Sequence, residues 1–314
     1  MADKADKLAE ALRREKEAAW SSRNADALGM IGNVNQFLPV TGDIQSGVQA
    51  AQDVKNKKYA SALMNSVGLL PFVPAIGGMF IGKGSKVWNP ANEQMFLQLE
   101  KEGMKPADIW AKTGTLRGAD KMLRQETSDL GSKITDNVFE GIKANQRYEG
   151  PMGEAFTNPE LYKAYPEAGN VTSGMYAWHK PEGSYHAESN TITVGGPGTT
   201  SQKNSAIHEL QHWVQNKEGF ARGANPENET DLIHQGMLRN ILEKNPGISY
   251  TDAVGMLPTR DAIQNLAMKN YNRSAGEVEA ELARTRMNMT PEERLANYPY
   301  KNINMKKMII RERE

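Results

Sequence analysis

Two histidines one helical turn apart, with a glutamate directly after the first, constrain this chain more than any other feature. They are His208, Glu209 and His212, within the stretch from Ser205 to Val214. Residues four apart lie on the same face of a helix, so both imidazoles can reach one ion. Zinc hydrolases use this H-E-x-x-H spacing, because neutral imidazole nitrogens suit Zn²⁺. The stretch therefore has to fold as a helix that packs on one face and presents ligands on the other.

The apolar residues around the motif support this helix. Five of them fall along one side, away from the two histidines: Ala206, Ile207, Leu210, Trp213 and Val214. We expect the helix to start after the break at Pro197-Gly198, with Thr199 and Gln202 forming a capping box. Gly219 is expected to end it. The alternative is a surface helix that carries two solvated histidines.

A catalytic zinc site needs a third protein ligand, and the best candidate is Glu277. It lies in a predicted helix start, where Glu277, Ala280 and Glu281 share one side and Glu279 points the other way. The small Ala280 would let a second helix approach closely. The alternative is that Glu277 forms a capping box with Ser274 and only satisfies backbone amides.

Three segments together resemble a known family: residues 207–215, 218–223 and 275–280. They are similar to the zincin-type metallopeptidase domain of tailed-phage and prophage proteins, which is often embedded in large virion-associated chains. A weaker similarity extends upstream, from Trp110 to Asp129. Its matching residues are Thr113, Gly114, Asp120, Arg124, Glu126 and Asp129, and the chain departs from the pattern at Thr115 and at Met122-Leu123.

The resemblance covers residues 104–287 and implies a gluzincin-like α+β fold with a small β-sheet. It also implies Zn²⁺ as the cofactor, with His208, His212 and Glu277 as its ligands. From the motif, Glu209 is expected to act as general base toward a metal-activated water that hydrolyses a peptide bond. Candidates for oxyanion stabilisation or for supporting the ligands are Tyr271, His234, Arg222 and Glu281, each with a structural or solvated role as the alternative.

A β-hairpin or a pair of strands is predicted before the motif helix, over residues 184–194. The segment alternates, is rich in β-formers and is bounded by glycines. In zincin folds an edge strand pairs with the extended substrate, so a four-residue stretch is a candidate peptide-binding edge: Thr191, Ile192, Thr193 and Val194. The alternative is an ordinary internal strand.

Composition and pattern divide the 314 residues into three parts. Residues 1–103 are predicted to form an α-helical N-terminal region with helices at 3–19, 43–54 and 59–68, followed by the domain at 104–287 and a charged C-terminal extension at 288–314. Equal numbers of basic and acidic residues, 38 each, leave no overall charge that would attract nucleic acid. Absence of cysteine excludes disulfides and thiolate metal ligands. The charged start indicates no secretory signal.

Residues 59–82 carry no formal charge and include the most apolar run of the chain. Two prolines and several glycines would break a membrane-spanning helix there, so a buried packing segment is preferred over membrane contact. A weak similarity to segments that precede toxin domains keeps a delivery role open.

The sequence thus predicts a zinc peptidase in a phage or prophage setting, in the host cytoplasm or the virion. Its partners would be a protein or peptide substrate and other virion proteins. Two alternatives remain: a non-catalytic virion or ejection protein with a zincin scaffold, and a delivered toxin protease.

Overall fold

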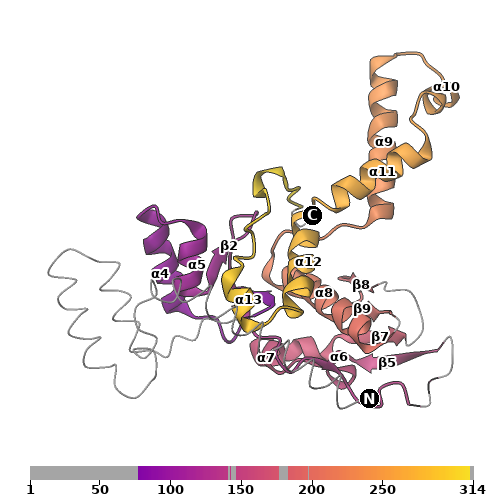
Figure 1. Cartoon of the computed structure of the whole chain (residues 1–314). Coiled ribbons are helices and arrows are strands. Elements are labelled where there is room, and N and C mark those ends of the chain that lie inside the picture. Colours follow the sequence, from indigo (N-terminus) through magenta and orange to yellow (C-terminus); the bar gives the residue numbers. More distant parts are fainter. Residues whose placement is uncertain (1–76, 141, 143–145, 177–182, 197, 312–314) are drawn as a thin grey trace, which may run out of the picture. The chain divides into compact units, whose positions relative to one another are not determined.

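The computed structural model describes residues 77–140, 142, 146–176, 183–196 and 198–311. Figure 1 shows the course of the chain through its helices and strands. The chain divides into two units, Met1–Phe72 and Val73–Glu314, and all described residues belong to the second. This unit mixes helices with sheets, in agreement with the predicted α+β class at that level. The helices expected at 3–19, 43–54 and 59–68 lie outside the described residues.

The elements follow one another along the chain without a repeat. The described strands are β1 Met79–Ile81, β2 Thr115–Arg117, β3 Leu123–Thr127, β4 Lys133–Ile134, β5 Arg147–Pro151, β6 Phe156–Thr157, β7 Thr172–Tyr176, β8 Gly183–His186 and β9 Thr191–Val194. The described α-helices are α4 Pro90–Lys101, α5 Pro106–Thr113, α6 Met152–Ala155, α7 Pro159–Ala164, α8 Thr199–Glu218, α9 Pro226–Lys244, α10 Tyr250–Gly255, α11 Arg260–Tyr271, α12 Ala275–Met287 and α13 Pro291–Ala296. Short 3-10 turns occupy Pro166–Asn170 and Met305–Lys307.

A four-stranded sheet in the order β5-β7-β9-β8 carries the predicted hairpin. Strands β8 and β9 pair antiparallel, with Gly183 opposite Val194 and His186 opposite Thr191, which confirms the paired strands expected over 184–194. Strand β9 also pairs parallel with β7. The prediction that Thr191–Val194 is an exposed edge is therefore wrong, because both sides of β9 are already hydrogen-bonded. The edge at this end of the sheet is β8.

A second sheet, in the order β1-β3-β2, corrects the predicted domain boundary. Strand β1 pairs antiparallel with β3, with Phe80 opposite Glu126. Phe80 is fully buried, and its backbone exchanges hydrogen bonds with the side chain of Gln211 on α8. Residues 77–103 thus belong to the same unit as the motif helix, and the division lies at Phe72 rather than at residue 103. Local sequence could not indicate this, since β1 packs through contacts more than forty residues away.

The apolar face of α8 forms part of the main core, as predicted. Its five apolar residues named above are all buried, and they join strands β1 and β9 and helix α12 in one cluster. The predicted capping box is wrong: Gly198 is the N-cap residue, and no side chain caps the helix. Gln202 is instead buried and donates its side-chain amide to the carbonyl of Tyr176 at 3.0 Å. Gly219 ends the helix in a left-handed conformation, as expected.

Helix α12 packs against α8, and small residues line the contact. Gly276 leaves no room for a Cβ beside the backbone of Arg222 and Gly223. Ala280 and Ala283 are fully buried. Because these side chains are short, the two helices come close enough for groups on α8 and α12 to meet.

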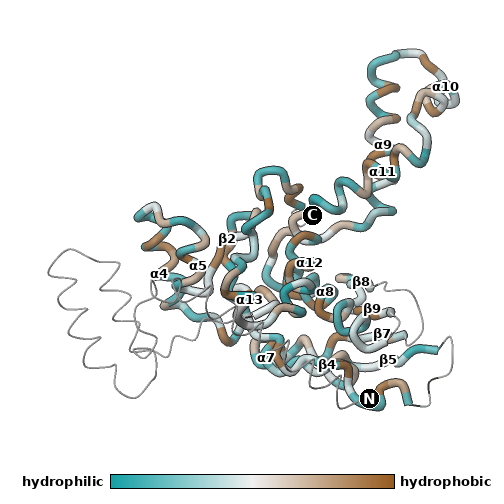
Figure 2. Tube along the Cα trace, in the orientation of Figure 1, coloured by the Kyte–Doolittle hydropathy of each residue, from teal (hydrophilic) through white to brown (hydrophobic). Residues whose placement is uncertain are grey.

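Helices α9, α10 and α11 form a helical arm between α8 and α12 in the chain. Within the arm, α9 packs on α11 and α10. Large apolar side chains such as Leu232, Tyr250 and Met256 are exposed on it. Figure 2 shows hydrophilic and hydrophobic stretches alternating along these helices.

The last described residues are integrated into the unit rather than forming the predicted extension. Tyr300 is buried and its hydroxyl donates to Oε2 of Glu279. Ile309 bridges Ser274 in parallel, and the carbonyl of Arg311 accepts from the amide of Arg222. Among the described helices none is long and apolar enough to cross a membrane. Most of the apolar segment at 59–82 lies outside the described residues, and its end contributes the buried strand β1.

Candidate metal centre

Helix α8 brings the two motif histidines together at its surface. The Nε2 atoms of His208 and His212 lie 3.1 Å apart, and the rings meet edge to face. Their side chains are 16 % and 12 % exposed, so both rings are largely shielded but open to one side. This differs from the alternative of two solvated histidines, which would be spread apart in water.

Glu277 on α12 completes the group. Its Oε2 lies 3.5 Å from Nε2 of His208, and its Oε1 lies 3.4 Å from Nε2 of His212. The expected capping box with Ser274 is not formed, because no side chain caps α12 and the Ser274 hydroxyl donates to the carbonyl of Asn270. The three residues predicted as ligands are therefore together, with their ligand atoms all within 4.8 Å of one another.

The donor set fits a divalent metal such as Zn²⁺. Metal–ligand bonds of about 2.0–2.1 Å place neighbouring donors of a tetrahedral site roughly 3.3 Å apart. The two Nε2 atoms lie 3.1 Å apart, and each of them lies 3.4 or 3.5 Å from a different oxygen of Glu277, so all three distances are close to that value. Oε2 of Glu277 is buried and accepts no hydrogen bond from any described residue. A buried carboxylate oxygen that accepts no hydrogen bond is unfavourable unless a cation binds it.

Glu277 and His212 shift each other's pKa. Burial by itself would lower the pKa of His212, but Glu277 outweighs it and raises that pKa to about 9. Burial would likewise raise the pKa of Glu277, yet the two histidines and the phenol of Tyr271 hold it well below its usual range. The carboxylate is therefore ionised at neutral pH, as a metal ligand must be.

A short loop after α8 closes over these residues. The amide of Ala224 donates to Oε1 of Glu277 at 2.8 Å. Gly223 has no room for a side chain, because a Cβ there would collide with Glu277 and with the ring of His212. Gly276 is similarly confined by the backbone of the loop. Two glycines thus allow the loop, α8 and α12 to meet at the proposed ligands.

Gln215 is hydrogen-bonded to His212, and the sequence did not lead us to predict this contact. Its side chain is buried, and its Oε1 lies 2.8 Å from Nδ1 of His212. Its Nε2 donates to the carbonyl of Gly276 at 2.9 Å and to Oε1 of Glu279 at 3.3 Å. The available signal was spacing, since Gln215 follows His212 by three residues and therefore shares its helical face.

Glu279 connects the site to the upstream segment that the resemblance covers. It accepts from Nε of Arg124 at 2.8 Å, and Arg124 also binds Asp120 through both carboxylate oxygens. Two further buried pairs join the same segment to the C-terminal part: Glu126 with Arg286, and Asp129 with Arg294. The charged residues that the resemblance singled out are therefore structural groups that fix β3 and the residues on either side of it to α12 and α13.

Glu209 follows His208 on α8 and is buried, with only 5 % of its surface exposed. Strand β8 covers it closely, since a Cβ on Gly183 would collide with its carboxylate and with the hydroxyl of Ser205. Burial raises the pKa of Glu209, and the two nearby histidines offset this only in part. A carboxylate with a raised pKa is the kind of group that can accept and return a proton near neutral pH.

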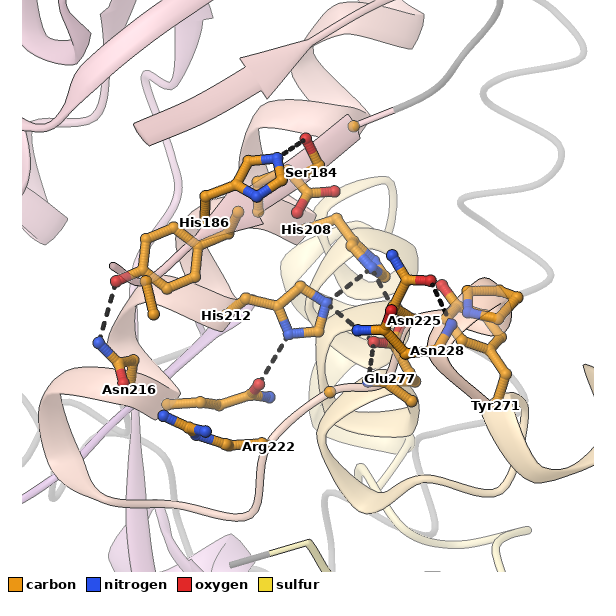
Figure 3. Close-up of a pocket in the computed structure, with 18 of the residues that line it drawn as sticks. Ser184, His186, His208, His212, Asn216, Arg222, Asn225, Asn228, Tyr271 and Glu277 are labelled. Carbon is orange, nitrogen blue, oxygen red and sulfur yellow. Dashed lines mark hydrogen bonds and ion pairs between the residues drawn. The ribbon is translucent and has the colours of Figure 1, made fainter. Parts of the chain in front are cut away.

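A pocket of about 690 Å³ opens over the site. It is lined by the three candidate ligands, Glu209, strand β8 with the turn after it, the loop from Arg222 to Asn225 and the first turn of α9. Figure 3 shows His208, His212 and Glu277 between two groups of polar side chains, with Asn216 and Arg222 on one side and Asn225, Asn228 and Tyr271 on the other.

The other predicted site residues have different positions. Tyr271 and Arg222 line the pocket. Burial, followed by the nearby Glu277 carboxylate, raises the pKa of Tyr271. His234 lies on α9 outside the pocket lining, and Glu281 is exposed and paired with Arg284, so neither has a contact that supports the expected role.

Comparison of the chain with protein-family models, with curated proteins and with solved structures finds no match. The resemblance to phage metallopeptidase domains therefore stays a prediction.

Proposed function

We propose that this chain is a zinc-dependent peptidase, with His208, His212 and Glu277 as the metal ligands and Glu209 as the general base. The observation that carries the proposal is the convergence of two imidazoles and one carboxylate from separate helices, all within 4.8 Å of one another, at the wall of an open pocket. Three protein ligands beside a pocket leave room for water and substrate, as catalytic zinc sites require.

The protein residues have distinct tasks in this proposal. Bound at these ligands, Zn²⁺ would supply Lewis-acid polarisation of a substrate carbonyl and make a water molecule acidic enough to ionise near pH 7. Glu209, whose pKa is raised by burial, would take the proton of the attacking water and pass it to the leaving amine. Tyr271, which lines the pocket, is the available candidate to stabilise negative charge on the reacting carbonyl oxygen.

The substrate would lie along β8 rather than β9. Strand β8 is the edge strand and lines the pocket. Its Gly183 lies against the side chain of Glu209. An unpaired strand edge offers backbone donors and acceptors to an extended peptide. A peptide added there would run past Glu209 and the ligand group, which favours a polypeptide over a compact small molecule as substrate.

Metal analysis and proteolysis test the proposal together. The purified full chain is expected to retain about one zinc per molecule, and the His208→Ala variant to lose it. Cleavage of an unfolded protein such as casein is expected for the wild type and absent in the Glu209→Gln variant, which should keep its zinc. A chain that holds zinc but cleaves neither casein nor a random peptide library would instead be a zinc-stabilised scaffold, and the peptidase proposal would be wrong.

The biological setting is proposed from the resemblance alone: a phage or prophage protein acting in the host cytoplasm or in the virion. A delivered toxin would be harmful to a host cell as wild type and harmless as Glu209→Gln. Harmless expression of both would count against that alternative.

A further inference from the structure

Arg222 is fixed beside the ligand group by its backbone. The preceding amide of Ala221 donates to Oδ2 of Asp120 at 2.7 Å, and the amide of Arg222 donates to the carbonyl of Arg311 at 3.0 Å. The following residue, Gly223, lies against Glu277 and His212 without room for a Cβ. The side chain of Arg222 therefore starts from a defined point at the edge of the site.

The guanidinium of Arg222 has no ionic partner among the described residues. Nearby arginines are paired: Arg311 with Glu229, Arg124 with Asp120 and Glu279, and Arg284 with Glu281. Arg222 lines the pocket, is only partly exposed, and is the one lysine or arginine among the described lining residues. An arginine held in a pocket without a carboxylate partner is available to bind an anion from outside.

The surroundings of Arg222 favour hydrogen bonding to such an anion. In Figure 3 Arg222 and Asn216 lie on the same side of His212, away from Asn225 and Tyr271. The side-chain amide of Asn216 donates to the hydroxyl of Tyr185 on β8 at 3.0 Å. Strand β8, the proposed substrate edge, thus meets the Arg222 side of the pocket through Tyr185.

The remaining charged groups restrict where a negative substrate group can lie. The acidic lining residues are Glu188, Glu209 and Glu277, and they would repel a second carboxylate placed near them. The side formed by Arg222 and Asn216 combines a permanent positive charge with a neutral polar group. The pocket therefore attracts a substrate carboxylate to the Arg222 side and repels it from the three glutamates.

We propose that Arg222 forms a subsite for a carboxylate of the substrate, so that the chain prefers peptides with an acidic group near the scissile bond. The inference rests on the proposed peptidase function and adds a substrate class to it. The planar guanidinium matches a carboxylate through two parallel hydrogen bonds, which a neutral amide cannot reproduce. The carboxylate comes either from an Asp or Glu side chain or from the chain terminus of the substrate, and the two sources share this chemistry.

Peptide hydroxamates test the subsite without requiring turnover, because the hydroxamate anchors on the bound metal. The probes are short peptide hydroxamates that carry Glu or its isostere Gln at one, two or three residues from the anchor, each with an amidated or a free terminus. Calorimetry measures their affinity for the zinc-loaded wild type and for Arg222→Gln. At one spacing, the acidic probe is expected to bind about 10-fold more tightly than its neutral isostere, and this ratio should fall to about 1 in Arg222→Gln.

The control is Arg239→Gln, which removes an exposed arginine of α9 outside the pocket lining and should retain the 10-fold ratio. Zinc content is measured for each variant, so that loss of metal is not mistaken for loss of the subsite. Equal binding of acidic and neutral probes to the wild type at every spacing, or an unchanged ratio in Arg222→Gln, overturns the subsite while leaving the peptidase proposal in place. Failure of every hydroxamate to bind the zinc-loaded wild type overturns the accessible metal centre, and the subsite with it.

Discussion

Oε1 of Gln215 lies 2.8 Å from Nδ1 of His212. The amide nitrogen of Gln215 is committed as a donor to Gly276 and Glu279, so its oxygen must be the acceptor toward His212. Nδ1 of His212 therefore carries a proton, and the lone pair of the neutral ring is at Nε2, which faces His208 and Glu277. One buried glutamine thus sets the tautomer that a metal ligand needs.

Replacing Gln215 with Leu is expected to weaken zinc binding by roughly 10- to 100-fold, because His212 loses the group that fixes its tautomer and orientation. Competition with a zinc chelator of known affinity measures this. Gln235→Leu, at an exposed position of α9, is the matched control and should bind zinc like the wild type. Equal affinities of the Gln215→Leu and Gln235→Leu variants would remove Gln215 from the site.

The site itself could be predicted largely from local patterns. A spacing of four fixes which side chains share a helical face, so His208 and His212 follow directly from the sequence once α8 is recognised. Glu277 could be selected as the third ligand from its place at a predicted helix start, although the same residues are also typical of a helix cap, and the resemblance implies the same residue. Gln215 could have been found by the same helical spacing that pairs it with His212.

Features that depend on long-range pairing could not be predicted in this way. The short run Thr191–Val194 looks the same in sequence whether it pairs on one side or on both, and only the contact with β7 makes it internal. The pairing of β1 with β3 and the ion pair between Arg124 and Glu279 join residues far apart in the chain. Nothing in the local sequence selects those partners from the many other charged residues.

Gly223→Ala is expected to weaken zinc binding by roughly 10-fold or more, because a Cβ would push against Glu277 and the ring of His212. Gly236→Ala provides a matched glycine replacement, since a Cβ at that helical position meets open space. This second variant should keep the zinc affinity and gain about 0.5–1 kcal/mol in stability from reduced backbone freedom. Zinc titration measures the affinity of both variants, and urea unfolding measures their stability. Unaltered zinc affinity in Gly223→Ala would contradict the close contact of Gly223 with Glu277 and His212.

Arg124→Met is expected to lower the free energy of unfolding by about 3–5 kcal/mol. It leaves Asp120 and Glu279 charged and without their main partner, and the two side chains are 8 % and 3 % exposed. The comparison is Arg284→Met, whose partner Glu281 is half exposed and solvated, so its effect should stay within about 1 kcal/mol. Urea unfolding measures both variants. Similar decreases in their free energy of unfolding would mean that the buried ion pairs of Arg124 do not stabilise the contact between β3 and α12.

The charge coupling at the ligands predicts how the stability of the chelator-treated protein depends on pH. The pKa of His212 is raised to about 9, so its contribution is complete below pH 6.5, the ordinary value, and is lost as the pH rises through 9. The pKa of Glu277 is lowered, so its contribution is present above 4.5 and is lost as the pH falls below that value. Urea unfolding in the presence of EDTA should therefore show that these groups stabilise the fold most between about pH 4.5 and 6.5. The free energy of unfolding should then decline by roughly 1–3 kcal/mol by pH 9.5.

The Glu277→Gln variant removes the partner of His212 and should abolish most of this decline. Saturating zinc should reverse the sign of the pH dependence, because protons then compete with the metal for the same nitrogens. A wild-type decline that Glu277→Gln leaves unaltered would show that the pH dependence arises elsewhere in the chain.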